Sequence, residues 1–165
     1  MNIEVWALLF LFIIPMPRSE AQSDPREYDV LRTIVFMRTE GLGMIDLLHS
    51  HSHNKEIKAL CLRMKSYYTE TQAGAVELCK GKDLQLSEKD VDVLLDRLKK
   101  GFENYNVERE SDYLQLFEEH INKSIQLYAE LVQEQRWEDI THFSFTALPE
   151  LFNMQQEIRK IKKRF

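Results

Sequence analysis

The sequence predicts an all-α protein: an antiparallel four-helix bundle with a short extra helix in the crossover and a last helix kinked by proline. Beyond residue 21, apolar residues recur at every third or fourth position, which is the period of an amphipathic helix. No stretch alternates apolar and polar residues as a half-buried strand does. Short polar connections separate the long periodic segments, and such helices pack most readily as antiparallel neighbours.

Residues 1–21 have the features of a secretory signal peptide. An apolar run at residues 5–14 precedes Pro15, and Ser19 and Ala21 occupy the −3 and −1 positions of a cleavage site. The run is shorter than the roughly 20 residues that cross a bilayer. We therefore expect cleavage after Ala21 and no stable membrane span in the mature chain. No Lys or Arg precedes the run, so an interfacial or uncleaved segment is the alternative.

Residues 22–165 are then a single helical-bundle domain, expected in the periplasm or on the extracellular side of a bacterial envelope. Loss of Glu4, Arg18 and Glu20 changes the net charge from −5 to −4, so the mature chain is mildly acidic. We expect no nucleic-acid partner, because proteins that bind nucleic acids present basic surfaces. The basic run at residues 159–164 complements the C-terminal end of a helix dipole.

The two cysteines are predicted to be free and mostly buried thiols. Cys61 and Cys79 lie 18 residues apart in a segment that is predicted to be one helix, which separates them by about 27 Å. A disulfide needs Cα atoms within about 7 Å. Gly74 lies between them, but a single glycine rarely stops a helix.

The first two long helices are predicted to form a hairpin. The first begins near Pro25, a favourable first-turn residue, and ends near residues 50–54. Asn54 can cap the second helix, and Gly81 is its expected end. The apolar stripes of the two helices contain Tyr28, Leu31, Ile34, Val35, Leu42, Ile45 and Leu48, and Ile57, Leu60, Cys61, Met64, Tyr67, Tyr68, Thr71, Ala75 and Leu78.

The short crossover helix is predicted to begin at Ser87, which with Asp90 resembles a capping box, and to end at Gly101. Its apolar residues are Val91, Leu94, Leu95 and Leu98.

Two further long helices complete the bundle, one from about Arg109 and a last one from about Trp137. Pro149 falls inside the last helix, where it removes one hydrogen bond and clashes with the preceding turn. We therefore expect a kink or a break within residues 145–149.

Five segments in order carry a resemblance to a known family: residues 54–64 (NKEIKALCLRM), 86–90 (LSEKD), 112–114 (DYL), 119–120 (EH) and 148–151 (LPEL). Their order and spacing are similar to the domain of unknown function 4142 family, which consists of exported bacterial proteins predicted to be ferritin-like helical bundles. The resemblance covers nearly all of the mature chain. It implies a ferritin-like fold and an envelope location, and it implies no established activity.

The chain departs from the family's polar positions. Members typically have an Asp-His pair shortly after the methionine that matches Met64, where this chain has Tyr67 and Tyr68. They also have a histidine where this chain has Met154, so His120 is the one polar position retained. A phenolate can bind ferric iron and a thioether can bind copper, but on an apolar stripe such residues are expected to be core.

Three alternating histidines, His49, His51 and His53, are the first candidate metal ligands. In an extended or turn conformation, alternate residues project to one side, so the three imidazoles could converge on Zn²⁺, Cu²⁺ or Ni²⁺, helped by Asp46. If the helix continued, His49 and His53 would share one face instead. The alternative is a solvated polar loop without a metal.

His120 is the fourth candidate metal ligand. It lies at the border of the apolar stripe of its helix, where Ser124 or Tyr113 could satisfy its ring by a structural hydrogen bond. The alternative is a metal ligand or proton carrier in the bundle interior. Glu119 cannot point inward together with His120, because successive helix residues do not face each other.

No catalytic residue and no cofactor is predicted beyond a possible divalent metal. The chain has no glycine-rich phosphate loop and no nucleophile elbow. We expect a non-enzymatic binding or structural protein of the cell envelope, with a metal-binding or metal-storage protein as the alternative. Phe143 and Phe152 lie off the main stripe of the last helix, where they mark a surface for a protein partner or homodimer, or a contact with the short crossover helix.

Overall fold

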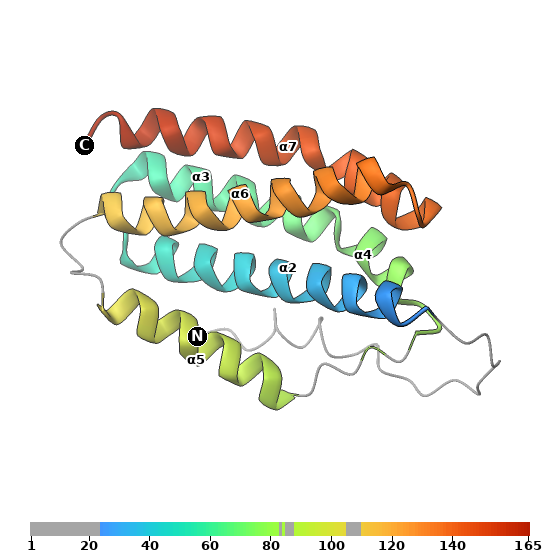
Figure 1. Cartoon of the computed structure of the whole chain (residues 1–165). Helices are drawn as coiled ribbons and strands as arrows, with labels where there is room; N and C mark the ends of the chain where they lie inside the picture. The colour runs from blue at the N-terminus through green and yellow to red at the C-terminus, as the bar shows by residue number, and fades with distance from the viewer. Residues whose placement is uncertain (1–23, 83, 85–87, 105–109) are drawn as a thin grey trace.

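The described part of the protein consists of helices and short connections, without strands, which confirms the all-α prediction (Figure 1). This computed structural model describes residues 24–82, 84, 88–104 and 110–165. Within those ranges the helices are α2 (Pro25–His51), α3 (Lys55–Glu70), α4 (Gln72–Cys79), α5 (Glu88–Asn104), α6 (Glu110–Glu134) and α7 (Glu138–Lys162).

Three sequence predictions concern residues outside these ranges. They are the signal peptide at residues 1–21, the Ser87 cap and the helix start at Arg109. Each of them stays a prediction. Among the helices that are described, none combines the length and the apolar character that a membrane span requires.

The helix ends follow the capping signals of the sequence. The Asp24 carboxylate precedes α2 and accepts a hydrogen bond of 3.0 Å from the backbone amide two residues later. The Asn54 side chain caps α3 as predicted, because its oxygen accepts from the amides two and three residues later. Gly81 follows α4 with a φ of 75°, a left-handed conformation that suits glycine, so the predicted end near this residue is confirmed.

The second long helix is interrupted, which corrects the prediction of one continuous helix. The interruption lies at Thr71, between α3 and α4, and not at Gly74. The Thr71 hydroxyl donates to the backbone oxygen of Tyr67 at 2.8 Å, and the Arg38 guanidinium donates to that of Tyr68 at 2.7 Å. Because these side chains bind carbonyl groups of the last turn of α3, the helix can change direction without leaving those acceptors unpaired.

Gly101 does not end its helix, contrary to expectation. Of the kink or break expected at residues 145–149, the break is absent and the kink stays a prediction. The α5 helix continues through Gly101 to Asn104. A Cβ at Gly101 would meet no atom within 4 Å, and one glycine costs a helix only about 1 kcal/mol. The α7 helix continues through Pro149 without a break. Its neighbours Ala147 and Leu151 are buried, so packing on both sides outweighs the lost hydrogen bond.

The α2 helix runs antiparallel to both α3 and α6. Residues 52–54 are the whole connection between α2 and α3, which therefore pack side by side in opposite directions. Along α2, Arg26 binds Glu134 at 2.7 Å and Glu40 binds His120 at 2.9 Å. The residue number on α6 falls as the number on α2 rises, which is the mark of antiparallel neighbours.

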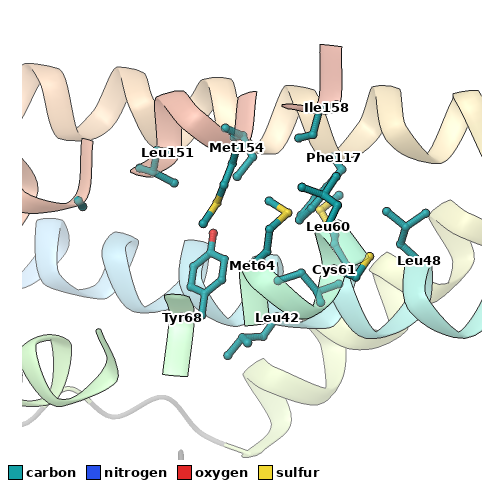
Figure 2. Close-up of a cluster of buried hydrophobic side chains, with 14 of the residues drawn as sticks. Leu42, Leu48, Leu60, Cys61, Met64, Tyr68, Phe117, Leu151, Met154 and Ile158 are labelled. Atoms are coloured by element: carbon teal, nitrogen blue, oxygen red, sulfur yellow. The ribbon is translucent and has the colours of Figure 1, made fainter. Parts of the chain in front are cut away.

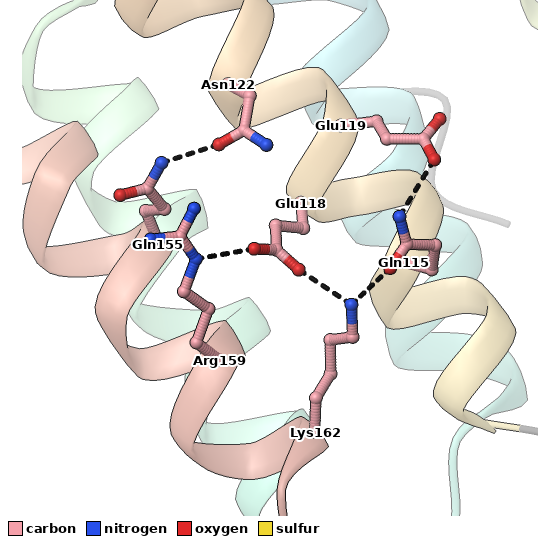
Figure 3. A network of polar contacts seen from close by, with 7 residues as sticks. All are labelled: Gln115, Glu118, Glu119, Asn122, Gln155, Arg159 and Lys162. Carbon is pink, nitrogen blue, oxygen red and sulfur yellow. Dashed lines mark hydrogen bonds and ion pairs between the residues drawn. The ribbon is translucent and has the colours of Figure 1, made fainter.

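The α6 and α7 helices form a second antiparallel hairpin, joined by polar contacts along its outer side (Figure 3). The Glu118 carboxylate accepts from Arg159 at 2.6 Å and from Lys162 at 2.7 Å, and Gln155 donates to Asn122. Burial alone would raise the pKa of Glu118, but the hydrogen bonds from the two cations outweigh it and lower that pKa. This carboxylate is therefore ionised at neutral pH and ties α7 to α6.

The α5 helix packs on α2. A Cβ at Gly43 would lie 3.0 Å from Leu98 and 3.1 Å from Leu95, so the glycine permits the two helices to approach closely. Beside this contact lies a cavity of about 130 Å³, bounded by residues of α2, α5 and α6. Its lining is Glu40, Met44, Leu94, Arg97, Leu98, Gly101 and Leu116.

The core lies between α2, α3, α6 and α7 and consists of close-packed aliphatic and aromatic side chains (Figure 2). Phe117 is completely buried within it. Figure 2 shows Tyr68 pointing toward Met154, and both are buried, as the interpretation of these two positions as core predicts. Other core residues include Leu31, Ile34, Ile45, Leu48, Ile57, Leu60, Met64, Leu114, Ile121, Leu151 and Ile158.

Both cysteines are free thiols, which confirms the prediction of no disulfide between them. Cys61 is buried, whereas Cys79 is only half-buried. Burial raises the pKa of Cys61 to about 12, and burial also raises that of Cys79. Both groups are therefore protonated at neutral pH and are poor nucleophiles.

Candidate functional site

A polar cluster, buried except for the partly exposed Glu40, lies among otherwise apolar side chains of the bundle. It consists of Glu40 and Gly41 on α2, Tyr68 on α3 and His120 on α6, together with Arg38 one turn before Gly41. The His120 Nδ1 atom lies 2.9 Å from a carboxylate oxygen of Glu40. Only 3% of the His120 surface is exposed, and its ring stacks on that of Phe117.

The Glu40 carboxylate fixes the hydrogen-bonding role of each His120 nitrogen. The hydrogen bond from His120 lowers the pKa of Glu40, against an opposing effect of burial, so this group is an ionised acceptor at neutral pH. An ionised acceptor places a proton on Nδ1, which in the neutral ring leaves Nε2 with a free lone pair. Among the described residues, that buried Nε2 atom has no hydrogen-bond partner.

Gly41 provides the space that Nε2 and the Tyr68 hydroxyl share. A Cβ at Gly41 would lie 2.7 Å from Tyr68 Oη and 2.8 Å from His120 Nε2. The two atoms are therefore at most 5.5 Å apart. Burial raises the pKa of Tyr68, so its hydroxyl is protonated at neutral pH and can donate a hydrogen bond. The site thus places a phenol oxygen and an imidazole nitrogen close to the position of one missing side chain.

Arg38 is a buried cation that makes no ion pair with any described residue. Its guanidinium donates to the Tyr68 backbone oxygen at 2.7 Å and to Gln72 at 3.3 Å. It also lies over the rings of Tyr68 and Phe143, at 5.2 and 5.8 Å from their centroids. These aromatic faces and carbonyl oxygens replace the carboxylate that usually compensates a buried cation.

Gly41→Ala is expected to lower the free energy of unfolding by about 1–3 kcal/mol, because the new methyl group overpacks the site. The atoms that it meets belong to two rigid rings held by the core. Gly101→Ala is the matched control: it has open space in α5 and is expected to raise stability by up to about 1 kcal/mol. Urea denaturation of both variants measures the difference, and equal effects would show that Gly41 has no steric role.

Glu40 is expected to make the free energy of unfolding fall as the pH becomes acidic. Its pKa is lower in the folded protein than in the unfolded chain, so its contribution to stability is complete above the ordinary Glu pKa of about 4.3. That contribution is lost as the pH falls through the lower folded value. Urea denaturation between neutral and strongly acidic pH should therefore show a shallower loss of stability for Glu40→Gln than for the wild type. Glu119→Gln, on the exposed face of α6, is the matched control.

The three alternating histidines lie at the tip of the α2–α3 hairpin and are held separately. His49 and His51 belong to the last turn of α2, and His53 lies in the connection. The His51 Nδ1 atom lies 2.8 Å from the Leu47 backbone oxygen, and that of His53 lies 3.2 Å from the His51 oxygen. Within the described residues, no three His, Cys, Asp or Glu side chains are grouped as metal ligands. Metal binding here stays a prediction.

Glu110 organises the same tip and was not singled out from the sequence. One of its carboxylate oxygens accepts from the Ser52 hydroxyl at 2.7 Å, and from the backbone amides of His53 and Asn54 at 2.8 and 3.2 Å. These three bonds join the start of α6 to the α2–α3 connection. Its position as an acidic residue in the first turn of a helix was the available signal.

The predicted structural partners of His120 need correction. The His120 ring binds Glu40 on another helix, whereas Ser124 donates its hydroxyl to the backbone oxygen of His120 at 3.1 Å. The other ring nitrogen, Nε2, has no hydrogen-bond partner among the described residues. Intrahelical spacing suggested both partners, but a contact between α2 and α6 depends on tertiary packing that the spacing does not encode.

The aromatic side chains of α7 divide into buried and exposed positions. Phe143 is partly buried, edge-on to Tyr128 at 5.9 Å and against Gly74, and its part in a partner surface stays a prediction. Phe145 and Phe152 are 63% and 45% exposed, and their seven-residue spacing places them on one face of α7. The crossover helix α5 packs on α2, so it does not account for these two residues.

No family model, curated protein or solved structure matches the chain.

Proposed function

We propose that the chain is an exported, non-enzymatic binding or structural protein of the cell envelope, built as a ferritin-like antiparallel four-helix bundle. The antiparallel pairing of α2 with α3 and α6, and of α6 with α7, supports this arrangement. The resemblance to the domain of unknown function 4142 family supports the envelope location and belongs to the same proposal.

The observation that carries a binding function is the exposed face of α7. Phe145 and Phe152 expose large apolar rings one above the other, on a helix whose buried face already packs against α3 and α6. Apolar residues grouped on one exposed face commonly mark a contact surface for another protein. The described interior is occupied by side chains, and the larger of the two best-defined cavities is about 130 Å³, much smaller than a typical ligand pocket.

Site-specific photo-crosslinking tests the contact surface. A photoreactive amino acid is placed at Phe145 or Phe152, and at Leu62 as a control, because Leu62 is 59% exposed on α3, away from this face. Crosslinks from α7 but not from position 62 would support the surface, and a product of twice the chain mass would identify a homodimer. Equal crosslinking at all three positions, or none, would contradict the proposal.

Export is tested on the full chain by cell fractionation and intact mass. The proposal expects a product in the periplasm or medium that lacks residues 1–21. A cytoplasmic product of full mass would contradict the proposed location.

Metal binding or storage is the second candidate function, and one observation favours it. His120 is almost completely buried, yet its Nε2 atom has no hydrogen-bond partner among the described residues. A buried nitrogen in that condition is costly in an apolar core unless a ligand uses it. Metal analysis of the purified protein, before and after loading, tests this function for His120 and for the tip histidines together.

A further inference from the structure

We propose that a second copy of this chain packs on the exposed face of α7, with the two α7 helices antiparallel about a two-fold axis midway between Phe145 and Phe152. The inference rests on the proposed contact surface of α7 and names the partner that covers it. A two-fold dimer uses the same surface on both copies, so that surface must be complementary to itself. The residues along α7 meet this condition.

The centre of the face is aromatic and uncovered. Phe145 and Phe152 expose large parts of their rings, Pro149 between them is also exposed, and α7 lies at the top edge of the bundle in Figure 1. The two phenylalanines are seven residues apart, which is about two helical turns or about 10 Å. A two-fold axis midway between them brings each Phe145 onto the Phe152 of the other copy. Four aromatic rings are then removed from water together, as at the core of a protein interface.

The two ends of the face carry opposite charges. Glu138 and Asp139 are exposed in the first turn of α7, and Lys160 and Lys163 are exposed at its other end. None of these four side chains forms an ion pair within the described part of the chain, so all are available to a partner. The helix dipole favours these signs at the ends of any helix, but it does not account for the exposed phenylalanines between them.

The spacing of the charges matches the spacing of the rings. Glu138 lies seven residues before Phe145, and Arg159 lies seven residues after Phe152, with Lys160 next to it. The axis that pairs the rings therefore also places the acidic start of each α7 beside the basic end of the other. A parallel pair would instead bring like charges together at both ends, which opposes association. A face that is complementary to itself in this way favours a second copy over an unrelated protein.

The pattern of exposed residues is that of a seam between two helices. Exposed side chains recur along α7 at alternating steps of four and three residues, the spacing that allows two helices to pack along their length. They are Glu138, His142, Phe145, Pro149, Phe152 and Gln156. Because the seam comes from one 25-residue helix of each copy, the interface is small and the dimer is expected to dissociate in the micromolar range.

Light scattering after size-exclusion chromatography tests the dimer. The purified protein is loaded at concentrations from about 1 to 200 μM, because small interfaces associate in this range. The wild-type mass is expected to rise from one chain toward two. Phe145→Ser/Phe152→Ser should raise the dissociation constant by about 100-fold or more, because each substitution occurs twice in the dimer. Leu62→Ser, at an exposed position of α3, is the control and should leave the constant unchanged.

Charge reversal tests the antiparallel arrangement. Glu138→Lys/Asp139→Lys makes both ends of the face basic, and Lys160→Glu/Lys163→Glu makes both ends acidic. Each double variant alone should dimerise about 10-fold more weakly than the wild type, because like charges then meet. An equimolar mixture of the two should regain the wild-type affinity as a mixed dimer. A mixture that associates no better than its components would overturn the arrangement.

The outcomes separate the second copy from the contact surface as such. A wild-type chain that stays monomeric throughout, or a dimer that survives in Phe145→Ser/Phe152→Ser, would overturn the proposal. If the monomeric chain still forms photo-crosslinks from Phe145 to a different protein, the contact surface stands and only the identity of the partner is wrong. A monomer without any crosslink would overturn both. Far-UV circular dichroism confirms that each variant is folded.

Discussion

Phe117→Ala is expected to lower the free energy of unfolding by about 3–5 kcal/mol. The side chain is completely buried in the core and its ring stacks on that of His120. Truncation removes its apolar contacts and leaves a cavity that rigid neighbours fill only in part. Urea denaturation measures the loss as a lower transition midpoint.

Phe145→Ala is the matched control for this substitution. Its ring is 63% exposed, so the monomer should change by no more than about 0.5 kcal/mol. A large loss at Phe145, dependent on protein concentration, would instead show that a second copy covers the α7 face. A small loss at Phe117 would contradict its place in the core.

Arg38→Ala is expected to cost about 1.5–3 kcal/mol, because it removes charged hydrogen bonds to the Tyr68 carbonyl and to Gln72. The backbone oxygen of Tyr68, near the end of α3, then loses the hydrogen bond that Arg38 donates to it. Arg32→Ala is the control, since Arg32 is exposed and lies over the Phe36 ring on the surface of the same helix.

Thermal and urea denaturation of both arginine variants measure the difference. Equal small losses would show that solvent replaces Arg38 at no cost. Arg38→Met should fall between the wild type and Arg38→Ala, because it also loses the hydrogen bonds but keeps the packing of the apolar stem.

The periodicity of apolar residues predicted the helices well, because each helix buries one stripe. Asn54 and Gly81 mark helix ends in the sequence and in the structure, since a cap and a left-handed glycine act locally. The interruption at Thr71 was missed, because it depends on a contact with another helix, which local propensity does not contain.

The sequence contained part of the site. Tyr68 and His120 were singled out, but Glu40, Gly41 and Arg38 were not. Positions 38 and 41 lie on the same stripe as Leu31, Ile34 and Ile45, so an arginine and a glycine at core positions were the available signal. The pairing of Glu40 with His120 was not predictable, because it joins residues 80 positions apart through a packing that only the folded chain defines.

The separation of the contacts along the chain has a consequence for how the protein folds. The α2–α3 and α6–α7 hairpins each close through short connections, so their formation costs little loop entropy. The contacts between the hairpins, such as Arg26 with Glu134, join residues 108 positions apart. The two hairpins should therefore form early, and their docking should limit the rate. The hydrogen bonds from the α2–α3 connection to the Glu110 carboxylate form in that later step. Substitution of Glu110 should therefore slow folding less than it speeds unfolding.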